Sequence, residues 1–387
     1  MKFVFAPDSF KGSLSAMDCC GILEKAAARV FPGAQTVSVP AADGGEGTLD
    51  ALLGAMGGRK VTTAVTGPLF ERRNAEWGLL ADGTAVLEMA QASGLPLVPE
   101  DRRDPRRTTS LGTGELIAAA LAAGAGRILI GIGGSATNDG GMGLLTALGA
   151  RFLDADGCPV RPVGGELTRV SRADFSGLAP ALRHTEITVI CDVTNPLLGE
   201  NGATWVYGPQ KGAVPAIRDE LEAGMAAYAK TVSACLGRDI ASFPGAGAAG
   251  GVGAALGGVL NAKLKSGVDA VLDAVHFDEK LAGASLVITG EGRIDGQSVR
   301  FGKVPAGVAG RCAARGIPVA VLAGGIGAGA EGLFDLCEST IMPTVSGPMS
   351  LEAAMANAAA GYESAAERLF RALRVGMKMR ASTEAVL

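Results

Sequence analysis

Short runs of apolar and β-branched residues recur along the chain, and most are followed by a loop and a helical pattern. Such runs occupy residues 3–6, 36–39, 127–132, 285–289, 318–322 and 339–342. The helical patterns cover residues 16–30 and 351–373 and begin at about 46, 141 and 302. Strands that alternate with helices are typical of a parallel sheet with helices on its faces.

A second pattern interrupts the first. Short strands with turns between them, at 60–65, 74–80 and 84–89, predict an antiparallel meander. Residues 186–192 and 203–207 predict further strands, and 214–236 and 251–275 predict helices. We therefore expect a discontinuous parallel α/β domain over 1–58, 105–150 and 282–387. A smaller mixed α+β domain, over 59–104 and 151–281, interrupts it.

Composition narrows the class of protein. The chain has 387 residues, of which 48% are hydrophobic and only 19% charged, and this favours two folded domains over long disordered tails. A net charge of -4 and an aromatic content of 4% argue against a nucleic-acid binder. The apolar runs are too short for a signal peptide or a membrane span, so we expect a cytoplasmic protein.

Cysteine and histidine are used sparsely. The seven cysteines are scattered and form no Cys-x-x-Cys pair, which is typical of reduced thiols and argues against a zinc site. The two histidines, His184 and His276, are too few for a histidine-based metal centre or a Ser-His-Asp triad.

Polar residues stand where predicted strands end, and in open parallel sheets this edge is where ligands bind. The first such loop carries Asp8, Ser9 and Lys11. We interpret Lys11 as a group that neutralises phosphate or a substrate carboxylate, and Asp8 as a partner of a metal or a hydroxyl. The alternative is an ordinary turn followed by a helix cap at Ser15.

The second loop, residues 42–48, combines Asp43 and Glu46 with glycines that allow a ligand to approach the backbone. Asp43 is a candidate metal ligand. The alternative is a helix start with acids near its positive end.

The third loop, residues 130–141, is rich in glycine and leads from a strand into a helix, where free N–H groups form an anion cradle. The residues expected to hold phosphate are Gly133, Gly134, Ser135 and Asn138. Gly131, Gly133 and Ala136 also fit a relaxed dinucleotide fingerprint, which leaves a nucleotide-dependent oxidoreductase as an alternative. A tight packing turn is the structural alternative.

The fourth loop begins at Asp192, which closes an apolar run. A carboxylate there could orient or deprotonate an attacking hydroxyl. The alternative is a turn before Pro196.

The fifth loop, residues 289–298, places acids beside cations, as a magnesium–nucleotide site requires. Glu291 and Asp295 are candidate metal ligands. Arg293 could clamp a substrate carboxylate, and Lys303 beyond the loop could bind phosphate. The alternative is a solvated loop with surface ion pairs.

Taken together, these strings resemble the two-domain bacterial glycerate kinases of type I. The matching segments are PDSFKGSLSA (7–16), ADGGEGT (42–48), MAQASGL (89–95), TTSLGTGELI (108–117), GIGGSATNDGG (131–141), CDVTNPLLGENGA (191–203), GPQKGA (208–213), PGAGAAGG (244–251), TGEGRIDGQS (289–298) and FGKVPAGVA (301–309). They extend over almost the whole chain in the family's order. Neither a P-loop nor the protein-kinase motifs occur in the sequence.

The resemblance implies a flavodoxin-like domain interrupted by a smaller domain of restriction-endonuclease-like topology. It implies ATP and Mg²⁺ as cofactors, D-glycerate as acceptor and 2-phosphoglycerate as product, with phosphorylation of the 3-hydroxyl as the alternative. Its partners would be these small molecules, with no nucleic acid and no membrane, and the oligomeric state stays open.

Within such a kinase we assign catalysis to Asp8, Lys11 and Asp192, and glycerate binding to Ser9 and Arg293. The motifs come from both predicted domains, so we expect closure around the substrate. A non-catalytic sensor of small acids is a further alternative. Such a sensor would not explain why the glycine loops carry so many acidic residues and lysines.

Overall fold

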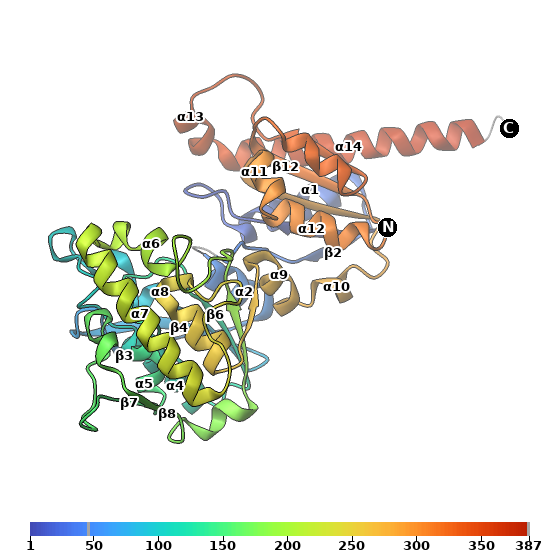
Figure 1. Cartoon of the computed structure of the whole chain (residues 1–387). Helices are drawn as coiled ribbons and strands as arrows, with labels where there is room; N and C mark the ends of the chain where they lie inside the picture. The colour runs from blue at the N-terminus through green and yellow to red at the C-terminus, as the bar shows by residue number, and fades with distance from the viewer. Residues whose placement is uncertain (45–46, 385–387) are drawn as a thin grey trace. The chain divides into compact units, whose positions relative to one another are not determined.

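The computed structural model describes residues 1–44 and 47–384, and the chain divides into two compact units (Figure 1). Unit 1 combines Met1–Met56 with the chain from Val271 onward, and unit 2 is Gly57–Ala270. The inserted unit is therefore the longer of the two, whereas the sequence predicts a smaller insert. The helix expected from about residue 46 begins at Thr48, and Gly45 and Glu46 lie outside the described residues.

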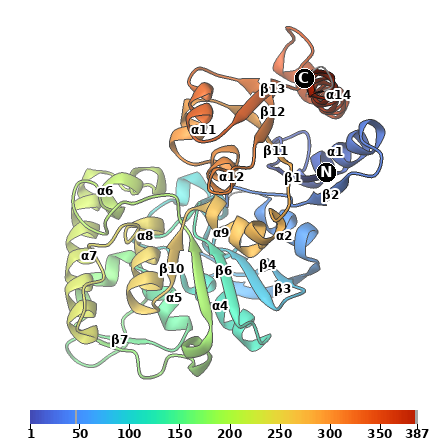
Figure 2. The same ribbon diagram turned by 90° about the vertical axis from the view of Figure 1, so that its right-hand side faces the viewer.

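Unit 1 is built on a five-stranded sheet in which every neighbouring pair is parallel (Figure 2). Its strands are β1 (Lys2–Pro7), β2 (Gln35–Ser38), β11 (Leu286–Ile294), β12 (Val319–Ile326) and β13 (Ser339–Pro343). The spatial order is β13-β12-β11-β1-β2, which is 2-1-3-4-5 when counted along the chain within the unit. The order reverses between β1 and β11, and such a switch point opens a crevice at the carboxyl ends of the strands.

Helices cover both faces of this sheet (Figure 2). On one face α1 and α14 pack against each other and against Phe3, Phe5 and Ile288. On the other, α12 packs against β1, β11 and β12. The helices of unit 1 are α1 (Ala16–Val30), α2 (Thr48–Met56), α10 (Phe277–Lys280), α11 (Gly296–Arg300), α12 (Val304–Ala313), α13 (Leu351–Ala356) and α14 (Ala358–Glu384), and α9 (Gly267–Ala274) crosses the boundary between the units.

Unit 2 contains a six-stranded mixed sheet of order β10-β9-β6-β5-β4-β3. Its strands are β3 (Gly58–Thr66), β4 (Arg72–Leu80), β5 (Thr84–Glu88), β6 (Arg127–Gly131), β9 (Glu186–Ile190) and β10 (Lys263–Lys265), and β7 (Arg151–Leu153) pairs separately with β8 (Arg172–Asp174). The predicted meander is confirmed, since β3, β4 and β5 pair antiparallel. The other pairs of the six-stranded sheet are parallel, and β7 pairs with β8 antiparallel.

The expectation that residues 105–150 belong with the terminal segments is wrong. Strand β6 hydrogen-bonds to β5 on one side and to β9 on the other, so this part of the chain lies in unit 2. The interior of β6 is buried, and a buried parallel strand has the same apolar pattern whichever sheet it joins.

The helices of unit 2 are α3 (Ala90–Ser93), α4 (Leu111–Ala122), α5 (Met142–Ala147), α6 (Ala203–Tyr207), α7 (Pro215–Leu236) and α8 (Ala248–Gly253). Short 3-10 helices occupy Leu95–Leu97, Glu100–Arg102, Gly164–Arg169, Pro180–His184 and Pro209–Lys211, with Ala330–Asp335 in unit 1, and Ala254–Val259 forms a π turn. None of the described helices combines the length and apolar character needed to cross a membrane.

Two predictions for unit 2 are wrong. Residues 203–207 form helix α6 instead of a strand, and there Thr204 accepts a buried hydrogen bond from Asn138. The helix expected over 251–275 is divided among α8, the π turn, β10 and α9. Asn261 has a left-handed backbone (φ 58°) between the π turn and β10, and helices stop at such a residue.

Candidate active site

A cavity of about 490 Å³ opens in unit 1 along the carboxyl edge of the five-stranded sheet. Seven of the residues predicted from the sequence line it: Asp8, Ser9, Lys11, Asp43, Glu291, Arg293 and Lys303. They come from the segments that follow β1 and β2, from the end of β11 and from the start of α12. The parallel register explains this convergence, because Pro7 pairs with Gly290 and so sets Asp8 beside Glu291.

Asp8 is a buried carboxylate, with 6% of the residue exposed. Its backbone N–H donates to the Gly290 carbonyl at 2.8 Å, and the Ser9 N–H donates to Asp8 Oδ1 at 2.6 Å. Burial, followed by the charge of Asp43, raises the pKa of Asp8 to about 6. This value lies close to the range in which a general base works best.

Glu291 is also only 6% exposed, and no group of the described residues forms a hydrogen bond with its Oε1 atom. Burial raises the pKa of Glu291 to about 7, with the charge of Asp8 adding to the effect while Ser298 and Lys303 oppose it. A buried carboxylate oxygen without a donor is costly to a fold and therefore points to a ligand that completes it.

The cations of the cavity are exposed to solvent. Lys11 Nζ lies 3.6 Å from Asp43 Oδ2, and Arg293 Nε lies 3.5 Å from Asp295 Oδ2. Ion pairs of this kind contribute little to stability, so these cations are better explained by ligand binding than by folding.

Asp295 does not line the cavity and instead caps helix α11. Its Oδ1 atom accepts hydrogen bonds from the N–H groups of Gln297 at 3.0 Å and Ser298 at 3.2 Å. These bonds, together with Arg293, lower the pKa of Asp295. Asp43 and Glu291 line the cavity without Asp295, although the charge of Asp295 still helps to raise the pKa of Glu291. Among the side chains that the structure describes, within residues 1–44 and 47–379, no group of three His, Cys, Asp or Glu is arranged to hold a metal.

The glycine loop that follows β6 lies in unit 2. Gly133 and Gly134 are exposed, and Gly134 has a left-handed backbone (φ 70°). Ser135 and Asn138 are buried. The Asn138 amide donates to Thr204 Oγ1 at 3.1 Å, while Asn138 Oδ1 has no hydrogen-bond partner among residues 1–44 and 47–384.

A lysine for which the sequence predicts no role supports this loop. Lys211 is 2% exposed and donates to Ser135 Oγ at 2.9 Å and to the Thr137 carbonyl at 2.7 Å. Burial lowers the pKa of Lys211 to about 7, and the charge of Asp139 opposes the shift. Lys211 lies in GPQKGA, one of the strings that resemble the family, but nothing in the string shows that its side chain is buried.

Asp139 fixes the end of the same loop. Its carboxylate accepts from the N–H and the hydroxyl of Ser110, at 2.8 and 2.7 Å, and from the N–H groups of Gly141 and Gly143. It is fully buried, which raises its pKa. The hydrogen bonds of Asp139 therefore hold the backbone at the end of the loop.

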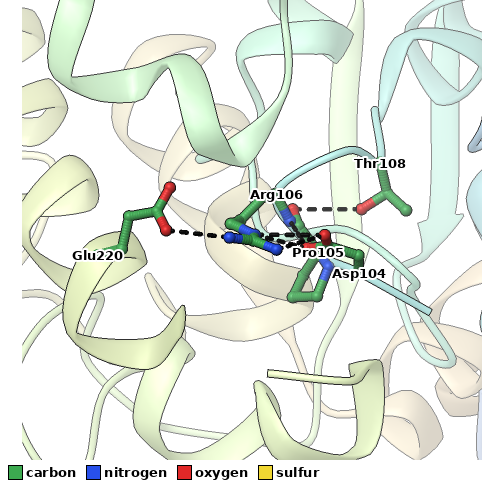
Figure 3. Close-up of polar contacts among 5 residues, drawn as sticks. All are labelled: Asp104, Pro105, Arg106, Thr108 and Glu220. Carbon is green, nitrogen blue, oxygen red and sulfur yellow. Dashed lines mark hydrogen bonds and ion pairs between the residues drawn. The ribbon is translucent and has the colours of Figure 1, made fainter. Parts of the chain in front are cut away.

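A second segment, residues 104–108, contacts this loop through Thr108. Figure 3 shows the polar contacts within this segment and with Glu220. The Arg106 guanidinium donates to both oxygens of Asp104 and to Glu220 on α7, and this contact lowers the pKa of Asp104. Thr108 Oγ1 donates to the Ala136 carbonyl at 3.0 Å.

Asp192 also lies in unit 2. Its side chain is exposed just beyond the end of β9, and its Oδ1 atom accepts from the Gly267 N–H at 2.8 Å. The structure therefore gathers seven predicted residues on the cavity of unit 1 and places Gly133, Gly134, Ser135, Asn138 and Asp192 in unit 2. The expectation of closure around the substrate stays a prediction.

Comparison with known proteins gives a consistent result. The model of the glycerate kinase family matches residues 3–374. The chain is 54% identical to glycerate 2-kinase of Escherichia coli over 80% of this chain and 81% of that protein. It is 47% identical to glycerate kinase of Bacillus subtilis over 98% and 99% of the two chains. A crystal structure from Salmonella typhimurium LT2, of a protein provisionally named glycerate kinase 2, superposes with a TM-score of 0.87 at 44% identity, over 98% and 99% of the two chains. This chain belongs to the glycerate kinase family.

Proposed function

We propose that this protein transfers the γ-phosphoryl group of ATP to the 2-hydroxyl of D-glycerate, giving 2-phosphoglycerate and ADP. The observation that carries the proposal is the convergence of buried carboxylates and exposed cations on one cavity of unit 1. Family membership supports ATP and glycerate as substrates. The name of the Escherichia coli relative, glycerate 2-kinase, supports the 2-hydroxyl over the 3-hydroxyl.

Phosphoryl transfer depends on positioning and on neutralising charge, with little covalent chemistry by the protein. Lys11 and Lys303 would offset the charge of the transferring phosphoryl group. Arg293 offers a planar fork suited to the glycerate carboxylate, and the Ser9 hydroxyl would bind the same substrate.

Mg²⁺ fits the donors of this cavity. Magnesium is held by one or two carboxylates together with substrate phosphates, and Glu291 Oε1 is a buried acceptor with no partner in the part of the chain that the structure describes. Glu291 and Asp43 would hold the ion. Asp295 is the weaker candidate, because the N–H groups of α11 already occupy its Oδ1 atom. Bound there, Mg²⁺ would neutralise charge on the phosphate oxygens.

The hydroxyl proton needs an acceptor. Asp8 is suited to this role because its pKa of about 6 leaves it mostly ionised at neutral pH while it stays basic. The role predicted for Asp192, that of orienting or deprotonating the hydroxyl, stays a prediction. The roles proposed for Asp192 and Lys11 are contradicted if Asp192→Asn and Lys11→Ala, made separately, both leave kcat/KM near wild type.

The glycine loop of unit 2 keeps its proposed role as an anion cradle. The exposed backbone at Gly133 and Gly134 would offer N–H groups to phosphate oxygens. Ser135 and Asn138 are buried beneath that backbone, so we propose that they act mainly by holding its shape.

The strand order 2-1-3-4-5 supports a flavodoxin-like assignment for unit 1, and we propose a restriction-endonuclease-like topology for unit 2. We also propose a cytoplasmic enzyme whose partners are its small-molecule substrates, without nucleic acid or membrane.

The deciding experiment combines the purified protein with ATP, Mg²⁺ and D-glycerate and resolves the product by phosphorus NMR. We expect the signal of 2-phosphoglycerate. A signal of 3-phosphoglycerate would overturn the proposed regiochemistry, and intact ATP in the presence of glycerate would overturn the substrate assignment.

A further inference from the structure

The cavity of unit 1 has an apolar part that phosphoryl transfer does not explain. Its lining includes Val345, Leu351, Ala354, Met355 and Ala358, from α13 and the residues beside it. Leu351 is 77% exposed and Met355 38% exposed, so neither side chain is buried in the hydrophobic core. Apolar side chains gathered beside a charged site are typical of a ligand-binding surface.

The helix that carries this apolar part has hydrogen-bonded ends. Ser350 caps α13 by accepting a hydrogen bond from the Ala353 N–H at 3.2 Å, and the Asn357 amide donates back to the Ala353 carbonyl at 2.9 Å. Met355 reaches the loop that carries Lys11, since a Cβ atom built on Gly12 would lie 2.8 Å from Met355 Cε. The apolar part is therefore continuous with the cationic part of the cavity.

The chemistry of the two substrates shows which of them fits the apolar part of the cavity. Every carbon of glycerate bears oxygen, so glycerate gains little from apolar side chains. A nucleoside triphosphate has a flat base for apolar contact and a chain of phosphates for cations. The cavity volume of about 490 Å³ lies in the range of sites for ligands of that size.

We propose that α13 forms the nucleobase wall of the enzyme. The base of ATP lies against Leu351 and Met355, and its phosphates extend toward Lys11 and Lys303. This inference rests on the proposed function, because it assumes that a nucleotide is one of the substrates.

Leu351→Asn tests the wall directly, because it removes an apolar contact while leaving the charged groups in place. The probes are adenylyl imidodiphosphate, which is a non-hydrolysable ATP analogue, and tripolyphosphate, which has no base. Each is titrated calorimetrically with Mg²⁺ into the full-length protein. We expect Kd for the analogue to rise about tenfold, the loss of roughly one buried aliphatic contact, with Kd for tripolyphosphate unchanged.

The matched control is Leu336→Asn. Leu336 is another exposed leucine of unit 1, and it does not line the cavity. We expect it to bind both probes as wild type does. Thermal melting should be unchanged in the Leu351 variant, because that side chain is mostly exposed. Met355→Asn provides an independent second variant on the same helix.

Two outcomes overturn the inference. Either both α13 variants bind the analogue as tightly as wild type, or they weaken tripolyphosphate binding in parallel. Failure of the proposed function looks different: the wild-type protein would bind the analogue, with the expected loss in the variants, yet would not phosphorylate glycerate.

Discussion

The ammonium of Lys211 is buried inside unit 2, where it donates a hydrogen bond of 2.9 Å to Oγ of Ser135. The same nitrogen donates to the Thr137 carbonyl at 2.7 Å. Burying a lysine ammonium is costly unless its N–H groups donate hydrogen bonds. Lys211 donates to two groups of the glycine loop, so its burial depends on that loop. It ties the turn at Pro209–Lys211 to the backbone that precedes Asn138.

Replacing this lysine should loosen the loop. Lys211→Met keeps a similar length but leaves the Ser135 hydroxyl and the Thr137 carbonyl without their donor. We expect kcat/KM to fall about tenfold or more and the free energy of unfolding to fall by about 1–3 kcal/mol. Steady-state kinetics and chemical denaturation measure the two effects. Lys230→Met, at an exposed position of α7, should change neither quantity. Wild-type kinetics in the Lys211 variant would show that the loop needs no such support.

We expect ionised Glu291 to lower the free energy of unfolding, although catalysis depends on this carboxylate. Its pKa in the folded protein is about 7, against an ordinary value of 4.5, so between these values the folded state binds more protons than the unfolded state. The stability contributed by this group is therefore present at low pH and is lost as pH rises through that window. Above about pH 7 the cost is complete, on the order of 1–3 kcal/mol.

Glu291→Gln removes this cost. At about pH 8 we expect the variant to be more stable than wild type by about 1–3 kcal/mol, yet to lose activity at least about a hundredfold. Urea denaturation at about pH 5 and pH 8 should show the gain shrinking at the lower pH. Glu331→Gln, at an exposed glutamate, should leave both stability and activity unchanged. A Glu291 variant that is less stable at both pH values would contradict the electrostatic argument.

Much of the unit 1 site can be predicted from the sequence. Parallel strands end at the same edge of a sheet, so Asp8, Asp43 and Glu291 converge once their strands are recognised. Asp295 shows the limit of this reasoning, since a loop aspartate followed by a helix suits a cap as well as a metal site, and here it caps α11.

The rest of the fold depends on contacts that local patterns do not contain. Residues 203–207 have a strand-like composition but form α6, because packing within unit 2 overrides the propensity of five residues. The apolar interior of β6 fits either sheet, and its pairing with β9 decides which one it joins. The burial of Lys211 and the apolar lining by α13 likewise arise only when distant segments pack together.

Magnesium binding should release a proton under mildly acidic conditions. At about pH 6 a Glu291 with a pKa of about 7 is mostly protonated, and a metal ligand must lose its proton to bind. At about pH 9 no proton is left to release. Calorimetric titration of Mg²⁺ in buffers of different ionisation enthalpy measures the protons released. We expect up to roughly one at the lower pH and none at the higher. Equal heats in all buffers at about pH 6 would remove Glu291 from the metal site.

Lys11 should contribute to catalysis without contributing to stability. Its side chain is exposed and its contact with Asp43 is 3.6 Å long, so Lys11→Met should change the free energy of unfolding by less than about 0.5 kcal/mol. Loss of a cation that offsets phosphate charge should lower kcat/KM by about a hundredfold or more. Lys25→Met, at an exposed position of α1, is the control and should behave as wild type.

If Lys11 only paired with Asp43, the Lys11 variant would retain full activity. If it binds the transferring group, kcat should fall more than KM rises, because the interaction strengthens as charge develops in the transition state.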